Sequence, residues 1–242
     1  MRFAALSLLL VFIFPALAQS PDEAVARQAM IRQIERNAAE LASLTGFPTL
    51  SPRVLQAFGK VPRHHFVPPQ WAELAYRDTP LPLGHGQNLT QPFLLALMTE
   101  VLALKPGERV FETGTDTGYQ AAILAELGVE VFSMEIVTPL LDIARKLLPA
   151  LGYAGVRLQE GDGYYGWAEN GPYDAMMVKE SAIDIPGVLW QQLKPGGRMV
   201  IPLGPPDDGQ MLTLAIKKLD GRAQRIPLMP VRFAPFQGGS RI

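Results

Sequence analysis

Hydrophobic and polar positions follow two alternating patterns along this chain of 242 residues. Short β-prone apolar runs alternate with longer stretches whose apolar residues recur at helical spacing. Such alternation predicts a mainly parallel sheet that is covered by helices on both faces. The expected strands are residues 109–113, 130–136, 156–159, 173–178 and 197–202, and the expected helices between them are 92–104, 119–127, 138–151 and 185–193.

Both ends of this alternating region carry additional elements. Residues 22–44 show helical apolar spacing among charged residues, which predicts an amphipathic helix. Ser51 followed by Pro52 predicts an N-cap and a second helix through Phe58. Near the other end, residues 211–217 and an extended segment that includes 231–235 predict two strands added antiparallel at the sheet edge. The predicted fold class is therefore α/β, with a doubly wound Rossmann-like sheet, an N-terminal helical extension and antiparallel C-terminal strands.

Residues 61–91 interrupt the pattern with many prolines and glycines, and we expect a long loop there. Long loops in compact domains are usually functional.

The N-terminal residues have the pattern of a secretory signal peptide. Arg2 precedes an apolar run, and Ala16 and Ala18 have the small-x-small form of a cleavage site. We therefore expect residues 1–18 to be a signal peptide, residues 19–60 a helical extension, and residues 61–242 the α/β domain. The mature chain would be periplasmic or secreted, with no membrane span. The alternative is a cytoplasmic protein whose translation starts near Met30.

Composition narrows the candidate chemistry. The formal net charge of −1, without a basic run, gives no reason to expect a nucleic-acid partner. The absence of cysteine excludes disulfides, a thiolate nucleophile and cysteine-based metal sites. The three histidines (His64, His65 and His85) have no metal-ligand spacing with a carboxylate partner, so we expect no metal site.

The candidate ligand site lies where the strand 109–113 meets a glycine turn and a helix. Strand, glycine turn and helix bring backbone N–H groups close to a nucleotide or nucleoside. A dinucleotide fingerprint is excluded, because Asp116 and Tyr119 stand where it requires glycines. Carboxylates also follow neighbouring strands, at the edge where open α/β folds bind ligands. The candidate residues are Glu112, Gly114, Gly118, Glu135, Asp162 and Gly163; alternatively, Glu112 and Asp162 are caps or turn formers.

Four motifs give the chain a resemblance to a known family. They are residues 61–68 (VPRHHFVP), 83–92 (LGHGQNLTQP), 193–204 (LKPGGRMVIPLG) and 231–235 (VRFAP). With the glycine turn, they resemble protein-L-isoaspartate O-methyltransferases over roughly residues 53–236. This resemblance implies an S-adenosylmethionine methyltransferase sheet. It also implies methyl transfer to the α-carboxylate of L-isoaspartyl or D-aspartyl residues in damaged proteins, with the ester then collapsing to succinimide.

The resemblance also implies roles for individual residues. Thr90 occupies the position of the family's substrate-loop serine and would orient the substrate carboxylate; alternatively, or in addition, it caps the helix near Pro92. Gln87 would lie between the two ligands. The remaining cofactor contacts would be Gly114, Thr115, Gly118 and Tyr119 around the methionine part, with Glu112 and Asp116 beside them, Glu135 on the ribose, and Asp162 and Gly163 by the adenine.

The chain departs from the family pattern beside this turn. Asp116 replaces a glycine, and Lys179 and Glu180 bring charge to a position where the family has small residues. Two hypotheses follow. The first is an active isoaspartyl methyltransferase with adapted cofactor contacts. The second is an exported, weakly active or inactive relative that binds damaged or flexible peptide segments. A methyltransferase for another substrate is a third possibility.

Overall fold

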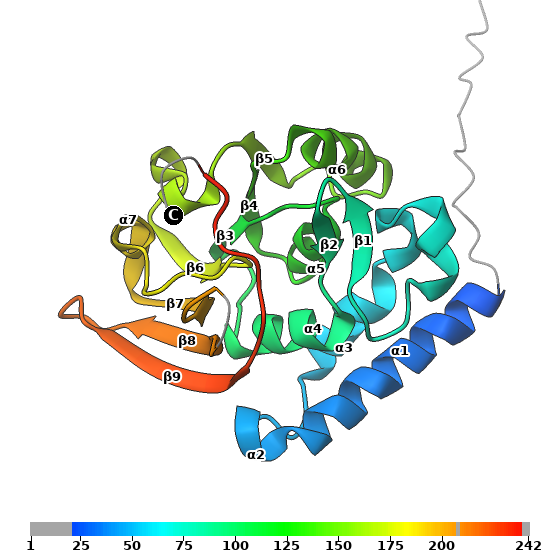
Figure 1. Ribbon diagram of the computed structural model, residues 1–242, viewed down its shortest axis with the longest axis horizontal. Coiled ribbons are helices and arrows are strands. Elements are labelled where there is room, and N and C mark those ends of the chain that lie inside the picture. The colour runs from blue at the N-terminus through cyan, green and yellow to red at the C-terminus, as the bar shows by residue number, and fades with distance from the viewer. Residues whose placement is uncertain (1–20, 207–208, 239–242) are drawn as a thin grey trace, which may run out of the picture.

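The computed structural model describes residues 21–206 and 209–238. The predicted signal peptide lies outside the described residues. Figure 1 shows a central sheet with helices packed around it and the long helix α1 (Pro21–Glu40) along one side.

The central sheet has seven strands in the order β5-β4-β3-β6-β7-β8-β9. Strands β5, β4, β3, β6 and β7 are mutually parallel, whereas β8 and β9 add antiparallel at the β7 edge. The predicted α/β class, the parallel sheet and the antiparallel C-terminal strands are thus confirmed. The strands are β3 (Arg109–Thr113), β4 (Glu130–Glu135), β5 (Arg157–Glu160), β6 (Tyr173–Met177), β7 (Leu193–Leu203), β8 (Met211–Lys217) and β9 (Ala223–Pro230).

Alternate residues of the strands enter two separate cores. Val110 of β3 belongs to the larger core, whereas the next residue, Phe111, belongs to the smaller one. This two-residue period is expected for a sheet that is buried on both faces. The larger core packs against α4 (Pro92–Val101), α5 (Tyr119–Glu126) and α6 (Thr138–Ala150), and the smaller core packs against α7 (Gly187–Gln192).

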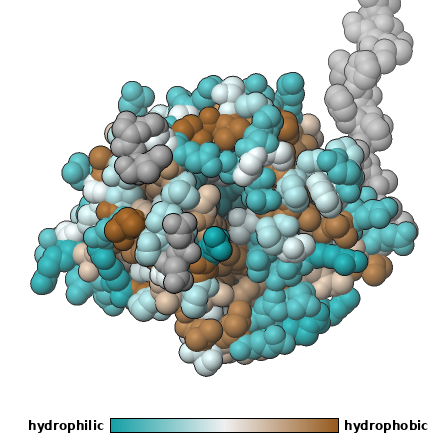
Figure 2. Space-filling model, in the orientation of Figure 1, coloured by the Kyte–Doolittle hydropathy of each residue, from teal (hydrophilic) through white to brown (hydrophobic). Residues whose placement is uncertain are grey.

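The N-terminal helices cover α4. Helix α1 packs against α4 and against α3 (Pro52–Lys60), and α2 (Ala42–Thr45) follows it. Ser51 accepts a bond from the Val54 N–H, which confirms the predicted N-cap. The outward side of α1, at the lower right of Figure 1, carries mainly hydrophilic residues in Figure 2. Among the residues described, none of the helices is both long and apolar enough to span a membrane.

The expectation of an unstructured loop over residues 61–91 is wrong in part. This segment contains a β-hairpin of β1 (Leu81–Gly84) and β2 (Gln87–Leu89), which pair antiparallel. His85 adopts the left-handed conformation at the hairpin tip, with φ 53°. Two 3-10 helices, η1 (Arg63–Phe66) and η2 (Pro69–Leu74), precede the hairpin. Prolines and glycines are as typical of tight turns and short elements as of irregular loops. Their number alone therefore did not distinguish this hairpin from a loop.

The C-terminal extended segment also differs from the prediction, whereas the start of α6 agrees with it. The last strand is β9, so residues 231–235 run beyond the regular strand and form only an isolated bridge between Pro235 and Ser181. Helix α6 begins at Thr138 as expected, and its N-cap Val137 makes no side-chain capping bond. The Thr138 hydroxyl instead donates to Glu160 on the neighbouring strand β5, at 2.7 Å.

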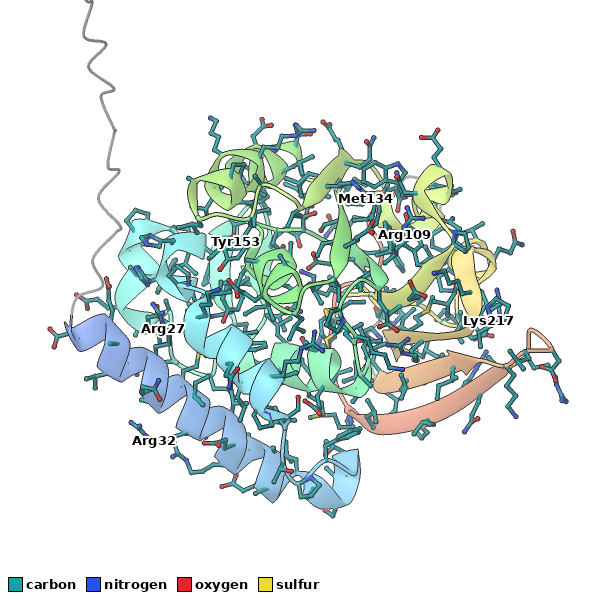
Figure 3. All side chains as sticks on the ribbon, turned by 180° about the vertical axis from the view of Figure 1, so that it is seen from behind. Arg27, Arg32, Arg109, Met134, Tyr153 and Lys217 are labelled. Carbon is teal, nitrogen blue, oxygen red and sulfur yellow. The ribbon has the colours of Figure 1, made fainter. Side chains whose placement is uncertain are left out.

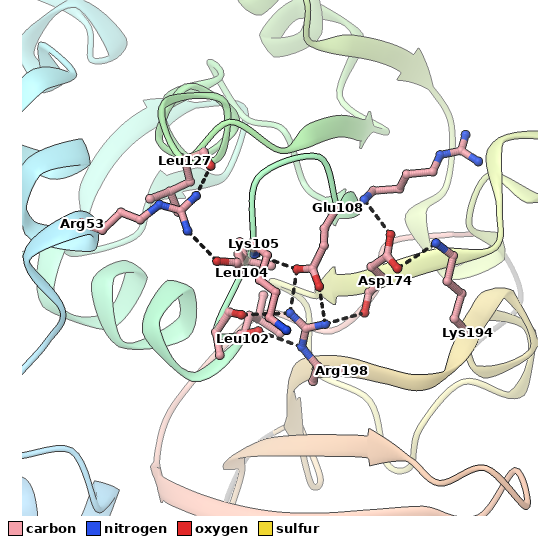
Figure 4. Close-up of polar contacts among 11 residues, drawn as sticks. Arg53, Leu102, Leu104, Lys105, Glu108, Leu127, Asp174, Lys194 and Arg198 are labelled. Atoms are coloured by element: carbon pink, nitrogen blue, oxygen red, sulfur yellow. Dashed lines mark hydrogen bonds and ion pairs between the residues drawn. The ribbon is translucent and has the colours of Figure 1, made fainter.

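Ion pairs secure the amino-terminal edge of the sheet, opposite the candidate site (Figure 4). Arg198 of β7 forms a salt bridge of 2.8 Å with Glu108, just before β3. Asp174 of β6 pairs with Lys194 at 2.7 Å and accepts a bond from the Arg109 N–H at 2.9 Å. The strands are therefore held together at one end, while their carboxyl ends support the candidate site.

Candidate functional site at the carboxyl edge of the sheet

The turn that follows β3 is held in place by its threonines. The Thr115 hydroxyl lies 2.7 Å from the Ser133 hydroxyl on β4, and the Thr117 hydroxyl donates to the Phe66 carbonyl at 2.6 Å. Thr113 accepts a bond from the Lys179 N–H at 3.0 Å. Three different segments therefore fix the turn, which is a preorganised support for a bound ligand.

Asp116 occupies the left-handed conformation, with φ 54°, at the position where the resemblance led us to expect glycine. Aspartate tolerates this conformation better than most residues do. Its N–H donates to Glu135 Oε2 at 2.7 Å, and its carboxylate lies 3.4 Å from Lys179 Nζ. The backbone at this position therefore keeps a turn conformation suited to glycine, while the added carboxylate has a cationic partner.

Lys179 pairs with two carboxylates beneath the cavity. Its Nζ lies 2.9 Å from Glu112 Oε1, and its side chain is only 5% exposed. Burial alone would lower the pKa of Lys179, but the nearby carboxylates of Glu112 and Asp116 raise it above its ordinary value. Glu112 also accepts a bond from Ser133 at 2.7 Å. Lys179 is thus a fixed cation at the base of the turn.

Glu180 lies directly against the glycine turn. Its Oε1 would be 2.7 Å from a Cβ added at Gly114, and its other oxygen accepts a bond from the Thr113 hydroxyl. Burial raises the pKa of Glu180 to about 7, and burial likewise raises the pKa of Asp116 to about 7. Near neutral pH, both carboxyl groups are therefore close to the midpoint of their titration.

These groups border a cavity of about 270 Å³. This volume is several times the ~30 Å³ that one water takes in the liquid, so the cavity has room for organic groups. Its walls come from the hairpin, the glycine turn, the ends of β4 and β6, and the C-terminal segment. The lining residues include Gln87, Asn88, Thr90, Gly114, Asp116, Glu135, Lys179, Glu180, Arg232, Phe233 and Gln237.

A buried arginine positions the hairpin segment beside the turn. Arg63 donates to the Ala75 carbonyl and to the Thr90 carbonyl, both at 2.8 Å. Its guanidinium also lies 4.8 Å from the centre of the Tyr119 ring, a cation–π contact. Residue 63 of the VPRHHFVP motif thus links the segment bearing Thr90 to the helix that follows the glycine turn.

Thr90 does not cap the helix near Pro92 in the described part of the chain. Gln91 is the N-cap of α4 and makes no capping bond through its side chain. The Phe93 N–H in the first turn donates instead to Asp78 at 2.7 Å. The Thr90 hydroxyl, which has no hydrogen bond to any described residue, is therefore available to a ligand.

The structure brings five of the predicted site residues to the cavity and places the others around it. Glu112 lies behind the cavity, bonded to Lys179. Tyr119 is fully buried and packs against Phe58 and Phe66, so its side chain supports the turn from the far side. Asp162 caps a short 3-10 helix, η3 (Gly163–Tyr165), as the alternative interpretation expected. The five at the cavity are Gln87, Thr90, Gly114, Asp116 and Glu135, whereas Thr115, Gly118, Tyr119, Asp162 and Gly163 do not line it.

The C-terminal segment is a part of the site that sequence reasoning assigned to a strand. Figure 1 shows this segment, in red, crossing in front of the sheet. It is secured by the Ser181 N–H, which donates to the Ala234 carbonyl at 2.8 Å, and by the Phe233 N–H, which donates to Gln210 at 2.7 Å. Gln87 donates to Gln237 at 3.2 Å across the cavity. In the sequence, the motif at residues 231–235 was the signal that could have indicated this contribution to the cavity.

The cavity fits the methionine and ribose part of S-adenosylmethionine. A Cβ at Gly114 would lie 2.7 Å from Glu180 Oε1, and its φ of 64° is a backbone conformation that favours glycine. Glu135 stands at the end of β4 with its carboxylate on the cavity wall, where it can accept bonds from ribose hydroxyls. A mixed set of carboxylates and one ammonium suits a ligand that carries charges of both signs.

This sheet order, with a glycine turn after β3 and an acidic residue at the end of β4, defines a Rossmann-like methyltransferase fold. The chain belongs to the protein-L-isoaspartate(D-aspartate) O-methyltransferase family, whose model matches residues 41–241.

Individual relatives agree with this assignment. The chain is 45% identical to protein-L-isoaspartate O-methyltransferase 1 of Cupriavidus necator, over 93% of this chain and 87% of the relative. It is 46% identical to protein-L-isoaspartate O-methyltransferase 2 of a Polaromonas species, over 86% of this chain and 99% of the relative. A solved protein-L-isoaspartate O-methyltransferase superposes with a TM-score of 0.75 at 28% identity, over 88% of this chain and 66% of that one. A Plasmodium falciparum structure with bound S-adenosyl-L-homocysteine has a TM-score of 0.73 at 22% identity, over 87% of this chain and 98% of that one, and supports the fold.

Proposed function

We propose that this chain transfers a methyl group from S-adenosylmethionine to the α-carboxylate of L-isoaspartyl or D-aspartyl residues in damaged proteins. The observation that carries the proposal is one cavity that joins Thr90 of the substrate segment to Gly114 of the glycine turn and Glu135 at the end of β4. Arg63 holds the two parts in register. The partners are accordingly proteins or peptides that contain such residues, and the near-neutral charge favours no nucleic acid among them.

In this reaction, the main task of the protein is to position the substrate carboxylate and the methyl donor. S-adenosylmethionine supplies an electrophilic methyl group on a sulfonium when it is bound. An unperturbed α-carboxylate is ionised at neutral pH, so no general base is needed to activate it. The protein must align the carboxylate oxygen with the methyl group and exclude water, which is a problem of proximity and orientation.

Two residues on the cavity wall can hold the substrate carboxylate. Thr90 presents a hydroxyl donor, and Arg232 presents a guanidinium that makes no ion pair with any described residue. Guanidinium and carboxylate match in geometry and charge. Because the same cavity also carries Asp116 and Glu180, a cation is needed to draw in an anionic substrate.

Kinetics with an isoaspartyl peptide test these roles. We expect Thr90→Val to lower kcat more than Thr90→Ser, because only the serine keeps the hydroxyl. We expect Arg232→Gln to raise KM for the peptide, with little change in the affinity for S-adenosylmethionine. If the unmodified protein and the three variants have the same kcat and the same KM for the peptide, the roles proposed for Thr90 and Arg232 are contradicted.

The relatives favour the enzyme over the alternative of an inactive peptide-binding protein. The ion pairs of Asp116 and Lys179 support the same choice, since they accommodate the main departure from the family within the turn. Calorimetric titration with S-adenosylmethionine separates the two. Peptide binding without any cofactor binding would favour the inactive protein.

We also propose export by the predicted signal peptide of residues 1–18, with residues 19–60 as the helical extension. Arg27 supports a chain longer than one starting at Met30, because it is buried and donates to the Gly59 and Lys60 carbonyls, each at 3.2 Å, and to the Tyr76 hydroxyl (Figure 3). A start at Met30 would remove these bonds. The N-terminal residue of the protein isolated from cells decides: Gln19 supports export, and Met30 contradicts it.

A further inference from the structure

The turn end of the cavity has an excess of acidic groups. Among the described residues, four carboxylates and one ammonium lie at this end: Glu112 and Asp116 pair with Lys179, and Glu135 and Glu180 stand on the cavity wall. Lys179 Nζ lies 2.9 Å from Glu112 Oε1, so its charge mainly neutralises one of the four carboxylates. Asp116, at 3.4 Å from the same ammonium, receives weaker compensation. Glu180 receives a hydroxyl bond from Thr113 rather than a salt bridge.

Other charged groups around the turn do not remove this excess. Arg63 faces the turn from η1, but its donors serve the Ala75 and Thr90 carbonyls. Arg232 lies on the C-terminal segment and is exposed to solvent. Because solvent screens exposed charges more strongly than buried ones, Arg232 offsets the buried carboxylates only weakly.

The cofactor and its product differ in charge at this end. S-adenosylmethionine has a sulfonium and an ammonium against one carboxylate, and so carries a net positive charge. S-adenosylhomocysteine has a neutral thioether in place of the sulfonium and is neutral overall. The two ligands otherwise share the same groups, so a site can separate them only through this charge and the methyl group.

We propose that Asp116 and Glu180 make the site selective for the cationic methyl donor over its neutral product, with Lys179 holding Asp116 in place. This inference rests on the proposed function and adds to it a means of releasing the product. After transfer, the ligand loses the positive charge that the carboxylates attract. Both residues are among the positions, with Lys179, at which this chain departs from the family resemblance, so we propose the selectivity for this chain and not for the family.

Ligand binding should also change the protonation of the two carboxyl groups, which can be measured separately from the affinity. A bound cation favours ionised carboxylates, so binding of S-adenosylmethionine near pH 7 should release protons from Asp116 and Glu180. Binding of the neutral product should release fewer. The affinity for the methyl donor should therefore rise between pH 6 and pH 8.5, while the affinity for the product changes less.

Calorimetric titration with both ligands, at both pH values and in buffers of different ionisation enthalpy, tests the proposal. In the unmodified protein at pH 8.5, we expect the product to bind at least about tenfold more weakly than the methyl donor. This factor equals about 1.4 kcal/mol, which one buried charge pair readily supplies. Glu180→Gln and Asp116→Asn should each reduce the ratio at least about threefold, and Glu35→Gln, an exposed carboxylate on α1, should not.

The outcomes separate this inference from the proposed function. A ratio near one that is independent of pH, in a protein that methylates isoaspartyl peptides, overturns the selectivity alone. Binding of neither ligand overturns both. If a variant fails to fold, the proton release of the unmodified protein still decides: equal release with the two ligands is incompatible with the proposal.

Discussion

Replacing Lys179 with methionine removes the ammonium that the turn carboxylates share. The side chain is 5% exposed, and its Nζ lies 2.9 Å from Glu112 and 3.4 Å from Asp116. Breaking a buried ion pair by removing one partner destabilises a protein by about 3–5 kcal/mol, because the other charge is left unpaired. Lys179→Met should therefore lower the free energy of unfolding by about this amount at pH 8.

The destabilisation caused by Lys179→Met should also depend on pH, in a direction that follows from the pKa values of its partners. Without the ammonium, Glu112 and Asp116 have folded-state pKa values further above those of the unfolded chain. The stability lost when they ionise is then recovered as the pH falls, so the difference from the unmodified protein should shrink at pH 5. Chemical denaturation followed by circular dichroism at both pH values measures this.

Two control variants sharpen this test. Lys179→Met combined with Glu112→Gln removes the charge that would be left unpaired, and it should recover at least about 1 kcal/mol relative to Lys179→Met alone. Lys218→Met changes an exposed lysine near the end of β8 and should have little effect. The reasoning is refuted if Lys179→Met costs less than about 1 kcal/mol at pH 8, or if the double variant is no more stable than the single one.

Three further predictions concern the turn and its neighbours. Gly114→Ala should abolish cofactor binding, because its Cβ would lie 2.7 Å from Glu180 Oε1; adding Glu180→Ala should restore part of the affinity in calorimetry, and no recovery would contradict this cause. Glu180→Gln should raise the melting temperature at pH 8 but not at pH 5, because burial raises the pKa of Glu180 to about 7 and its ionisation above that pH destabilises the fold; an equal shift at both pH values would contradict this. Arg63→Met should increase hydrogen exchange of residues 81–90 by loosening the Thr90 carbonyl, and unchanged exchange would show that the hairpin does not depend on Arg63.

The sheet and the glycine turn could be predicted from the sequence because both depend on local patterns. The alternation of strand and helix patterns predicted a parallel sheet but not its strand order, and Gly114 with Glu135 indicated a ligand site at the carboxyl edge. The hairpin of residues 81–89 could not be predicted in the same way, because its prolines and glycines are equally typical of an irregular loop.

The charge network at the turn also lay beyond sequence reasoning. Asp116 and Lys179 each looked like a separate departure from the family, and they are 63 residues apart in the chain. Only the pairing of β3 with β6 brings them to within 3.4 Å. The contribution of the C-terminal segment likewise depends on tertiary bonds to Ser181 and Gln210, which no local pattern encodes.

The most direct test of the proposed function is transfer of a labelled methyl group to matched peptides. The mature protein is incubated with labelled S-adenosylmethionine and either an isoaspartyl peptide or the same peptide with normal aspartate. We predict a base-labile methyl ester on the isoaspartyl peptide alone, which is lost in Glu135→Ala because this change removes the proposed ribose contact at the end of β4. Labelling of neither peptide by a folded protein, or equal labelling of both, would contradict the account.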